Sequence, residues 1–195
     1  MSMQIMTKDN SSHIKGKVDF KTIMESGQSF SGFPMPEICG DFDFVIKADG
    51  TWLYQGTPVG RKKLVQLFAT VLQKDNDGYW LITPSEKGKI TVEDAPFFMV
   101  EIHVENAGMK RQSIHFRSTL DWWIQANFEN KIWIEVDEDT GQPSPYIMVR
   151  DNLHARMNRN TFYALCELAE CEENEEGTTE MFVLSNGVKF SLGSI

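Results

Sequence analysis

The 195-residue sequence contains no apolar run of about 18 residues, the length that a membrane-spanning helix needs. Its first residues, MSMQIMTKDNSSHIK, lack the apolar core of a secretory signal peptide. Only three cysteines occur, and because Cys39, Cys166 and Cys171 have no metal-binding or disulfide spacing, we expect reduced thiols in the core. These absences predict a cytoplasmic protein with no membrane span.

Motifs of the common catalytic sites are also missing. The run GTPVGRK has three residues where a phosphate-binding P-loop needs four, and neither serine nor threonine follows it. The dinucleotide-binding, nucleophile-elbow and zinc-protease motifs do not occur. His103 and His115 could face each other across a hairpin, but no third ligand accompanies them. We therefore expect no catalytic residue, no metal and no cofactor.

Positive charge is in deficit, with a formal net charge of −9, so nucleic acid is not an expected partner. Seven glutamates lie in one cation-free stretch, residues 167–180, and the remaining charges nearly balance. Such a stretch is typical of a solvated surface, with an acidic docking face as the alternative.

The pattern of strands and helices indicates an α+β protein. Residues 1–35 are polar and predict a tail with one short helix around Asp19–Glu25. Strand-like runs flank the turn Asp49-Gly50, and a helical stripe follows. Then come YWLIT and KITVE, which are strand-like. The stripe consists of Leu64, Leu67, Phe68, Val71 and Leu72.

The same order recurs in the second half of the chain. KIWIEV and PYIMV precede a helical segment, and EMFVL and VKFSL follow it. In residues 97–128, which lie between the two copies, apolar and polar residues alternate. This pattern predicts two or three further strands that extend the second sheet. The stripe of the second helix is expected to contain Phe162, Leu165, Cys166 and Ala169.

Aligning the two helices places Gly60 on Asn158 and Arg61 on Arg159, so that helix cap and helix core coincide. We interpret this as a tandem strand-strand-helix-strand-strand repeat. The predicted organisation is a tail, residues 1–35, an N-terminal repeat domain, residues 36–95, and a C-terminal repeat domain, residues 96–195.

Three cations, Arg61, Lys62 and Lys63, stand where the first helix should begin. Each opposes the helix dipole by about 0.3–1 kcal/mol, so a compensating anion is expected. Arg61 extends the buried stripe, and Arg159 has the same place in the second helix. Two interpretations remain open: a bound phosphate at the seam between the halves, or an internal ion pair of Arg61 with Asp94 or Glu93.

Three separated runs carry a family resemblance: DGTWLYQGTPVGRKKLVQLF, DGYWLITPSEKGKITVEDAPF and PYIMVRDNLHARMNRNTFYALCELA. From about Pro36 onward the chain resembles a bacterial family of unknown function with duplicated motifs. The resemblance implies two domains, a C-terminal half superficially similar to pleckstrin-homology domains, and a site between the halves for a nucleotide or nucleotide-derived ligand. It also implies a part in signal transduction. The matching residues are Arg61, Thr83, Glu86, Lys87, Asp94, Pro96, Phe97, Arg150 and Arg156, and Arg159 joins them through the repeat alone.

The leading hypothesis is a non-catalytic module that binds a phosphate-bearing small molecule, with a signalling protein as a further partner. The alternative is a protein-interaction module whose pleckstrin-like half receives a peptide at an exposed sheet edge. A third hypothesis is a nucleotide hydrolase, in which Glu86, Glu93 and Asp94 hold a metal, although their spacing matches no known motif.

Overall fold

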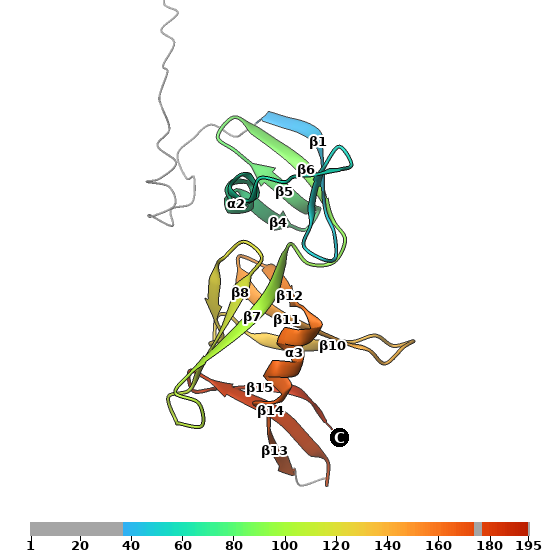
Figure 1. Ribbon diagram of the computed structural model, residues 1–195. Helices are drawn as coiled ribbons and strands as arrows, with labels where there is room; N and C mark the ends of the chain where they lie inside the picture. The colour runs from blue at the N-terminus through green and yellow to red at the C-terminus, as the bar shows by residue number, and fades with distance from the viewer. Residues whose placement is uncertain (1–36, 174–176, 195) are drawn as a thin grey trace, which may run out of the picture. The chain divides into compact units, whose positions relative to one another are not determined.

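The computed structural model describes residues 37–173 and 177–194, which are mostly β-strand (Figure 1). This part of the chain contains two α-helices and two curled six-stranded sheets, so the expected strand-rich α+β organisation in two halves is confirmed. The helix predicted around Asp19–Glu25 lies outside the described residues. Neither described helix has the length and hydrophobicity needed to cross a membrane.

The first sheet belongs to the N-terminal half and has the strand order β3-β2-β1-β6-β5-β4. The central pair β1–β6 is parallel, and every other neighbouring pair is antiparallel. Helix α2 (Lys62–Thr70) connects the two three-stranded meanders. The strands are β1 (Glu37–Ile46), β2 (Trp52–Tyr54), β3 (Thr57–Pro58), β4 (Leu72–Asp75), β5 (Gly78–Ile82) and β6 (Glu86–Val92).

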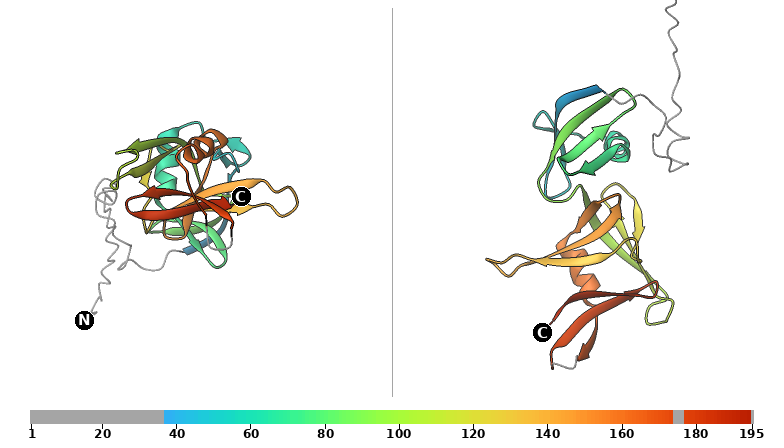
Figure 2. Two further views of the ribbon diagram at one scale, coloured as in Figure 1. Left: turned by 90° about the horizontal axis from the view of Figure 1, so that it is seen from below. Right: turned by 180° about the vertical axis from the view of Figure 1, so that it is seen from behind.

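The second sheet has the order β10-β11-β12-β7-β8-β9, again with one parallel pair, β12–β7, at its centre. Its other neighbours are antiparallel. The hairpin β10–β11 projects from the body of this half (Figure 2). The strands are β7 (Phe97–Glu105), β8 (Ser113–Ser118), β9 (Trp123–Gln125), β10 (Ile132–Val136), β11 (Pro143–Arg150) and β12 (Leu153–Met157).

The two sheets share one topology. Read from its β9 edge, the second sheet has the order β9-β8-β7-β12-β11-β10, and this is the order of the first sheet with six added to every strand number. The helices do not take equivalent places in the two copies. Helix α2 lies between β3 and β4, whereas α3 (Arg159–Cys166) follows β12. The helix-centred repeat is therefore not confirmed: strands after α2 return to the same sheet, and strands after α3 form a sheet of their own.

This third sheet consists of β13 (Glu170–Glu173), β14 (Thr179–Ser185) and β15 (Val188–Ser194). Ser185 joins it to the second sheet, because its buried hydroxyl accepts from the Ile114 N–H and donates to the Ala126 carbonyl. Glu172 and Glu180 of the acidic stretch both bind Lys189 across the strands. Cys166 is half-buried but Cys171 is exposed on β13, so the expectation of core thiols is wrong for Cys171.

The buried face of α2 differs from the predicted stripe. Val65 and Ala69, four residues apart, are buried in the hydrophobic core, whereas Leu64 and Leu67 are exposed. Leu64 instead lines a surface groove. In α3, Thr161 and Leu165 are buried, and Ala169 lies beyond the end of the helix. The predicted helical spacing of buried residues is therefore correct in both helices, but the buried face is rotated about the helix axis relative to the predicted stripe.

Asn158 caps α3 as the sequence indicates, since its side-chain oxygen accepts from the Thr161 N–H at 2.7 Å. We predict that Asn158→Ala lowers the free energy of unfolding by about 1 kcal/mol, because this N–H loses its partner. Asn160→Ala, an exposed change in the same turn, is the matched control and should have little effect. Urea unfolding measures both, and equal stabilities of the two variants would contradict the cap.

Candidate functional site

Asp94 connects the two halves at the point where the first sheet ends and the second begins. One carboxylate oxygen accepts from the Tyr146 hydroxyl at 2.8 Å, and the other from the Arg156 guanidinium at 2.6 Å. Tyr146 and Arg156 are register partners on β11 and β12. Arg156 also donates to the Ser144 hydroxyl at 3.2 Å. Charge-assisted bonds of this kind hold both partners in fixed geometry, and we call these four residues the Asp94 joint.

Aromatic rings surround the Asp94 joint on the second sheet. Trp133 stacks on Tyr146 with ring centroids 5.5 Å apart, and His154 meets Tyr146 edge-on at 5.4 Å. Burial, followed by the hydrogen bond to Asp94, raises the pKa of Tyr146 to about 12. Burial, followed by the charge of Lys74, lowers the pKa of His154. Both rings are therefore held in their neutral forms near pH 7.

Arg150 holds the C-terminal end of α2. Its guanidinium donates to the Ala69 carbonyl at 2.7 Å and to the Leu72 carbonyl at 3.4 Å. A cation at this end complements the helix dipole, and it satisfies the Ala69 carbonyl, which belongs to the last turn of the helix. At the other end, Lys62 pairs with Asp121 at 2.6 Å. Arg150 is thus committed to the fold and is not available to a ligand.

Two further predicted site residues also have structural partners. Lys87 pairs with Asp75 at 3.2 Å and lies 4.1 Å from the centroid of the Trp80 ring. Phe97 is buried and meets Trp122 edge-on, with 5.6 Å between ring centroids. Both residues therefore support the packing of their own sheets.

A cavity of about 570 Å³ opens at the first turn of α3, and we call it the α3 pocket. Arg156 and Arg159 bring positive charge to it, and Asp49 brings one negative charge. The Thr161 N–H is used by the Asn158 cap and the Phe162 N–H by the Asn158 carbonyl, which leaves the first N–H groups of the helix available. The lining residues are Ala48, Asp49, Phe98, Gln142, Pro143, Pro145, Arg156, Met157, Asn158, Arg159, Phe162 and Tyr163.

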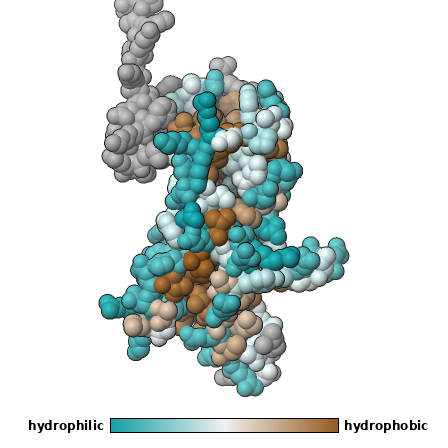
Figure 3. All heavy atoms as spheres, viewed as in Figure 1, coloured by the Kyte–Doolittle hydropathy of each residue, from teal (hydrophilic) through white to brown (hydrophobic). Residues whose placement is uncertain are grey.

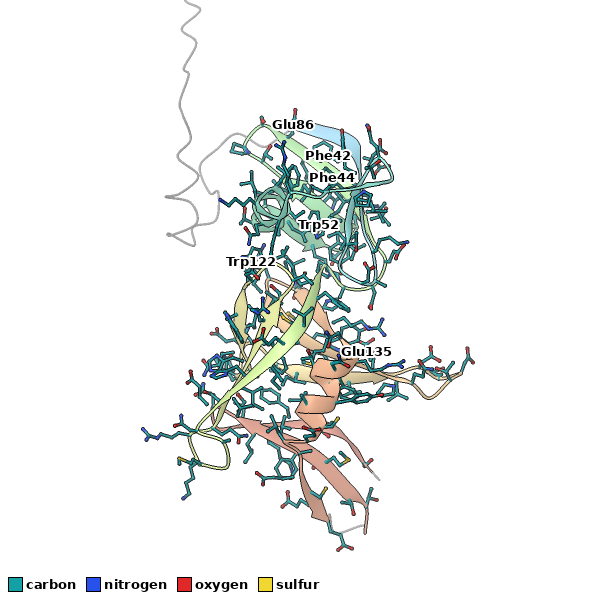
Figure 4. All side chains as sticks on the ribbon, viewed as in Figure 1. Phe42, Phe44, Trp52, Glu86, Trp122 and Glu135 are labelled. Carbon is teal, nitrogen blue, oxygen red and sulfur yellow. The ribbon has the colours of Figure 1, made fainter. Side chains whose placement is uncertain are left out.

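A second cavity, of about 770 Å³, lies in the N-terminal half between β1, α2 and the turn that joins β5 to β6. We call it the N-terminal groove. Figure 4 labels Phe42, Phe44 and Glu86, which line it. Its remaining lining residues are Asp41, Asp43, Tyr54, Thr57, Pro58, Val59, Gly60, Arg61, Leu64, Phe68, Val71, Leu81 and Thr83.

Arg61 lies on this groove rather than beside either acid considered as its partner. Glu93 pairs with Lys47, and Asp94 pairs with Arg156. Among the described residues Arg61 makes no ion pair. Thr83 holds the nearby turn, because its hydroxyl accepts from the Glu86 N–H at 3.1 Å.

The structure therefore distributes the predicted site residues over several places. Arg61, Thr83 and Glu86 line the N-terminal groove, whereas Arg156 and Arg159 line the α3 pocket. The other five belong to the Asp94 joint, the end of α2 and the packing of the sheets, namely Lys87, Asp94, Pro96, Phe97 and Arg150.

His103 and His115 face each other across the β7–β8 hairpin as expected, with ring centroids 6.5 Å apart. Ser113 lies 3.1 Å from the His115 ring nitrogen Nε2. Within the described ranges, no group of three or more His, Cys, Asp or Glu side chains is arranged to hold a metal ion.

Family models match nearly all of the described chain. A model described as the N-terminal domain of a domain of unknown function, DUF1285, matches residues 34–95, and the corresponding C-terminal domain model matches residues 96–192. The chain belongs to the DUF1285 family. This assignment confirms the resemblance to a family of unknown function with two halves.

Two crystal structures of DUF1285 proteins resemble this chain. The protein from Silicibacter pomeroyi DSS-3 is 36% identical over 86% of this chain and 91% of its own, with a TM-score of 0.74. The protein from Shewanella baltica OS155 is 27% identical over 65% of this chain and 91% of its own, with a TM-score of 0.52. No curated protein matches the sequence.

The raised pKa of Tyr146 gives a test of the Asp94 joint. Tyr146→Phe should lower the free energy of unfolding near neutral pH by about 1–3 kcal/mol, because Asp94 loses a donor. In the wild type the contribution of the protonated phenol is complete below pH 10.0 and is lost as pH rises toward about 12. The stability difference between wild type and variant should therefore shrink over that range.

Urea unfolding at a series of alkaline pH values measures this difference. Tyr163→Phe, an exposed change, is the control and should leave stability almost unaltered at each pH. A difference for Tyr146→Phe that stays constant from neutral to alkaline pH would contradict the assigned role of this hydroxyl.

Proposed function

We propose that this DUF1285 protein is a non-catalytic module that binds a phosphate-bearing small molecule in the α3 pocket. The observation that supports the proposal is the combination of Arg159 with unused backbone N–H groups at the start of a capped helix. Arg159 is exposed and makes no ion pair with any described residue. Helix N-termini bind phosphate through these N–H groups and the helix dipole, and a guanidinium adds bidentate contacts.

Arg156 contributes charge to the same pocket in a different way. Asp94 accepts from one terminal nitrogen of its guanidinium and Ser144 from the other, so Arg156 adds attraction with little further loss of conformational freedom. Because Asp94 offsets much of its charge, Arg159 is the stronger candidate for direct contact with phosphate.

The aromatic lining of the α3 pocket favours a ligand with a flat ring as well as a phosphate. Phe98 and Phe162 are half-buried there, and Tyr163 is 57% exposed. Aromatic side chains at such places can stack on a nucleobase, which agrees with a nucleotide or nucleotide-derived ligand. Ala48 and Asp49 come from the N-terminal half, so a bound ligand would touch both halves.

We also propose a part in signal transduction and a pleckstrin-homology-like C-terminal half. Both rest on the resemblance in sequence alone. Neither is needed for binding in the α3 pocket, since that binding depends on Arg159 and the first turn of α3.

Arg159→Ala tests the proposal. We expect it to weaken binding of a phosphorylated ligand by about 1.5–3 kcal/mol, the scale of a hydrogen bond to a charged group. The apo protein should unfold at nearly the same temperature, because this exposed side chain has no described ion-pair partner. Thermal unfolding of the full chain with a panel of nucleotides and cyclic nucleotides measures both effects.

Arg111→Ala is the matched control, since Arg111 is also exposed but lines neither cavity. A nucleotide that raises the unfolding midpoint of wild type and Arg111→Ala, but not of Arg159→Ala, supports the proposal. If no phosphorylated compound raises the wild-type midpoint, or if the two variants respond alike, the α3 pocket is not the site.

A further inference from the structure

The N-terminal groove has an apolar floor built from aromatic rings. The Phe44 ring lies 4.9 Å from the Phe68 ring and 4.8 Å from the Tyr54 ring, measured between centroids. Phe42 lies against Gly88 of β6, where a Cβ atom would come within 2.2 Å of the ring. Gly88 therefore allows the ring to lie close against the sheet and to become part of the groove.

Acidic side chains stand around this floor. Asp41, Asp43 and Glu86 are exposed, and within the described residues their carboxylates have neither an ion-pair partner nor a hydrogen-bond donor. Arg61 is the cation among the lining residues. With three carboxylates and one guanidinium, the lining of the groove has a net negative charge, which favours a cationic occupant over a phosphate.

Two apolar side chains that line the groove are also exposed to solvent. Tyr54 is 45% exposed and Leu64 is 38% exposed, although both are large. Figure 3 shows brown apolar atoms at the surface of this half among teal hydrophilic ones. The aromatic floor and these two side chains together present more apolar surface than a small ion can cover, so a peptide segment suits the groove better.

We propose that the N-terminal groove is a docking site for a segment of a partner protein that carries apolar residues flanked by lysine or arginine. The apolar residues would pack on Phe42, Phe44 and Phe68, and the flanking cations would approach Asp41, Asp43 and Glu86. This inference concerns a different cavity from the α3 pocket, and it does not depend on phosphate binding there.

A peptide-display selection tests the proposal on the full chain. A library of random peptides is selected on the wild-type protein. We expect enrichment of peptides that combine apolar residues with lysine or arginine. Fluorescence anisotropy then measures the affinity of one enriched peptide, and replacing its basic residues by glutamate should weaken binding at least about tenfold.

Two sets of protein variants locate the binding. Leu64→Ser should weaken binding about fivefold to tenfold, whereas Leu67→Ser, 36% exposed on the same helix but outside the groove, should not. The triple change of Asp41→Asn, Asp43→Asn and Glu86→Gln should weaken binding about tenfold. A triple change of exposed acids elsewhere, Glu129→Gln, Glu138→Gln and Asp139→Asn, should have little effect.

Several outcomes would overturn the proposal. Enriched peptides without basic residues, or no enrichment at all, would contradict the assigned partner chemistry. Equal binding to Leu64→Ser and Leu67→Ser would place the peptide elsewhere. If light scattering finds a wild-type dimer that Leu64→Ser converts to monomer, the groove is an interface between copies of this chain and the partner assignment is wrong.

Discussion

The carboxylate of Asp94 is the contact on which the arrangement of the candidate site depends. It lies where the first sheet ends and binds two residues of the second, Tyr146 and Arg156, with one oxygen each. Removing the carboxylate would leave a phenol and a guanidinium without their partner in a partly buried place, which costs more than the bonds themselves contribute. The α3 pocket takes lining residues from both halves, so its shape follows from this joint.

Two further contacts also join the two halves, through helix α2. Arg150 donates to the Ala69 carbonyl in the last turn of α2, and Gln66 of α2 donates to the Leu120 carbonyl at 2.7 Å. Residues of the C-terminal half therefore bind helix α2, and its Phe68 ring packs on Phe44 of the first sheet. Arg150, Arg156 and Arg159 are near one another in sequence. The first two bind structural partners, which leaves Arg159 for a ligand.

Much of the fold could be predicted from the sequence, because short-range signals decide it. The turn at Gly50, the alternating strands and the Asn158 cap all depend on neighbours within a few residues. Strand β12 was missed, since LHARM reads as part of a charged loop, although Leu153, Ala155 and Met157 alternate on its buried face. The helix-centred repeat was not confirmed because apolar stripes of short helices resemble one another whatever the surrounding topology.

The candidate site was less predictable, because it depends on contacts between distant residues. Tyr146 is 52 positions from Asp94, and Arg150 is 81 positions from Ala69. A strand reading of PYIMV places Tyr146 in a sheet but does not identify its partner. The charges along the sequence also do not show that Arg61 and Arg159 belong to cavities of opposite charge. Arg61 shares the N-terminal groove with three carboxylates, whereas Arg159 shares the α3 pocket with Arg156 and a single aspartate.

The most direct test of phosphate binding in the α3 pocket is a backbone amide NMR titration of the full chain with a phosphorylated nucleotide. We expect the amide signals of Arg159 and Asn160 to shift most, in a saturable manner, because no acceptor among the described residues binds their N–H groups. Saturable shifts that centre on the N-terminal groove, or the absence of any saturable shift across the nucleotide panel, would contradict it.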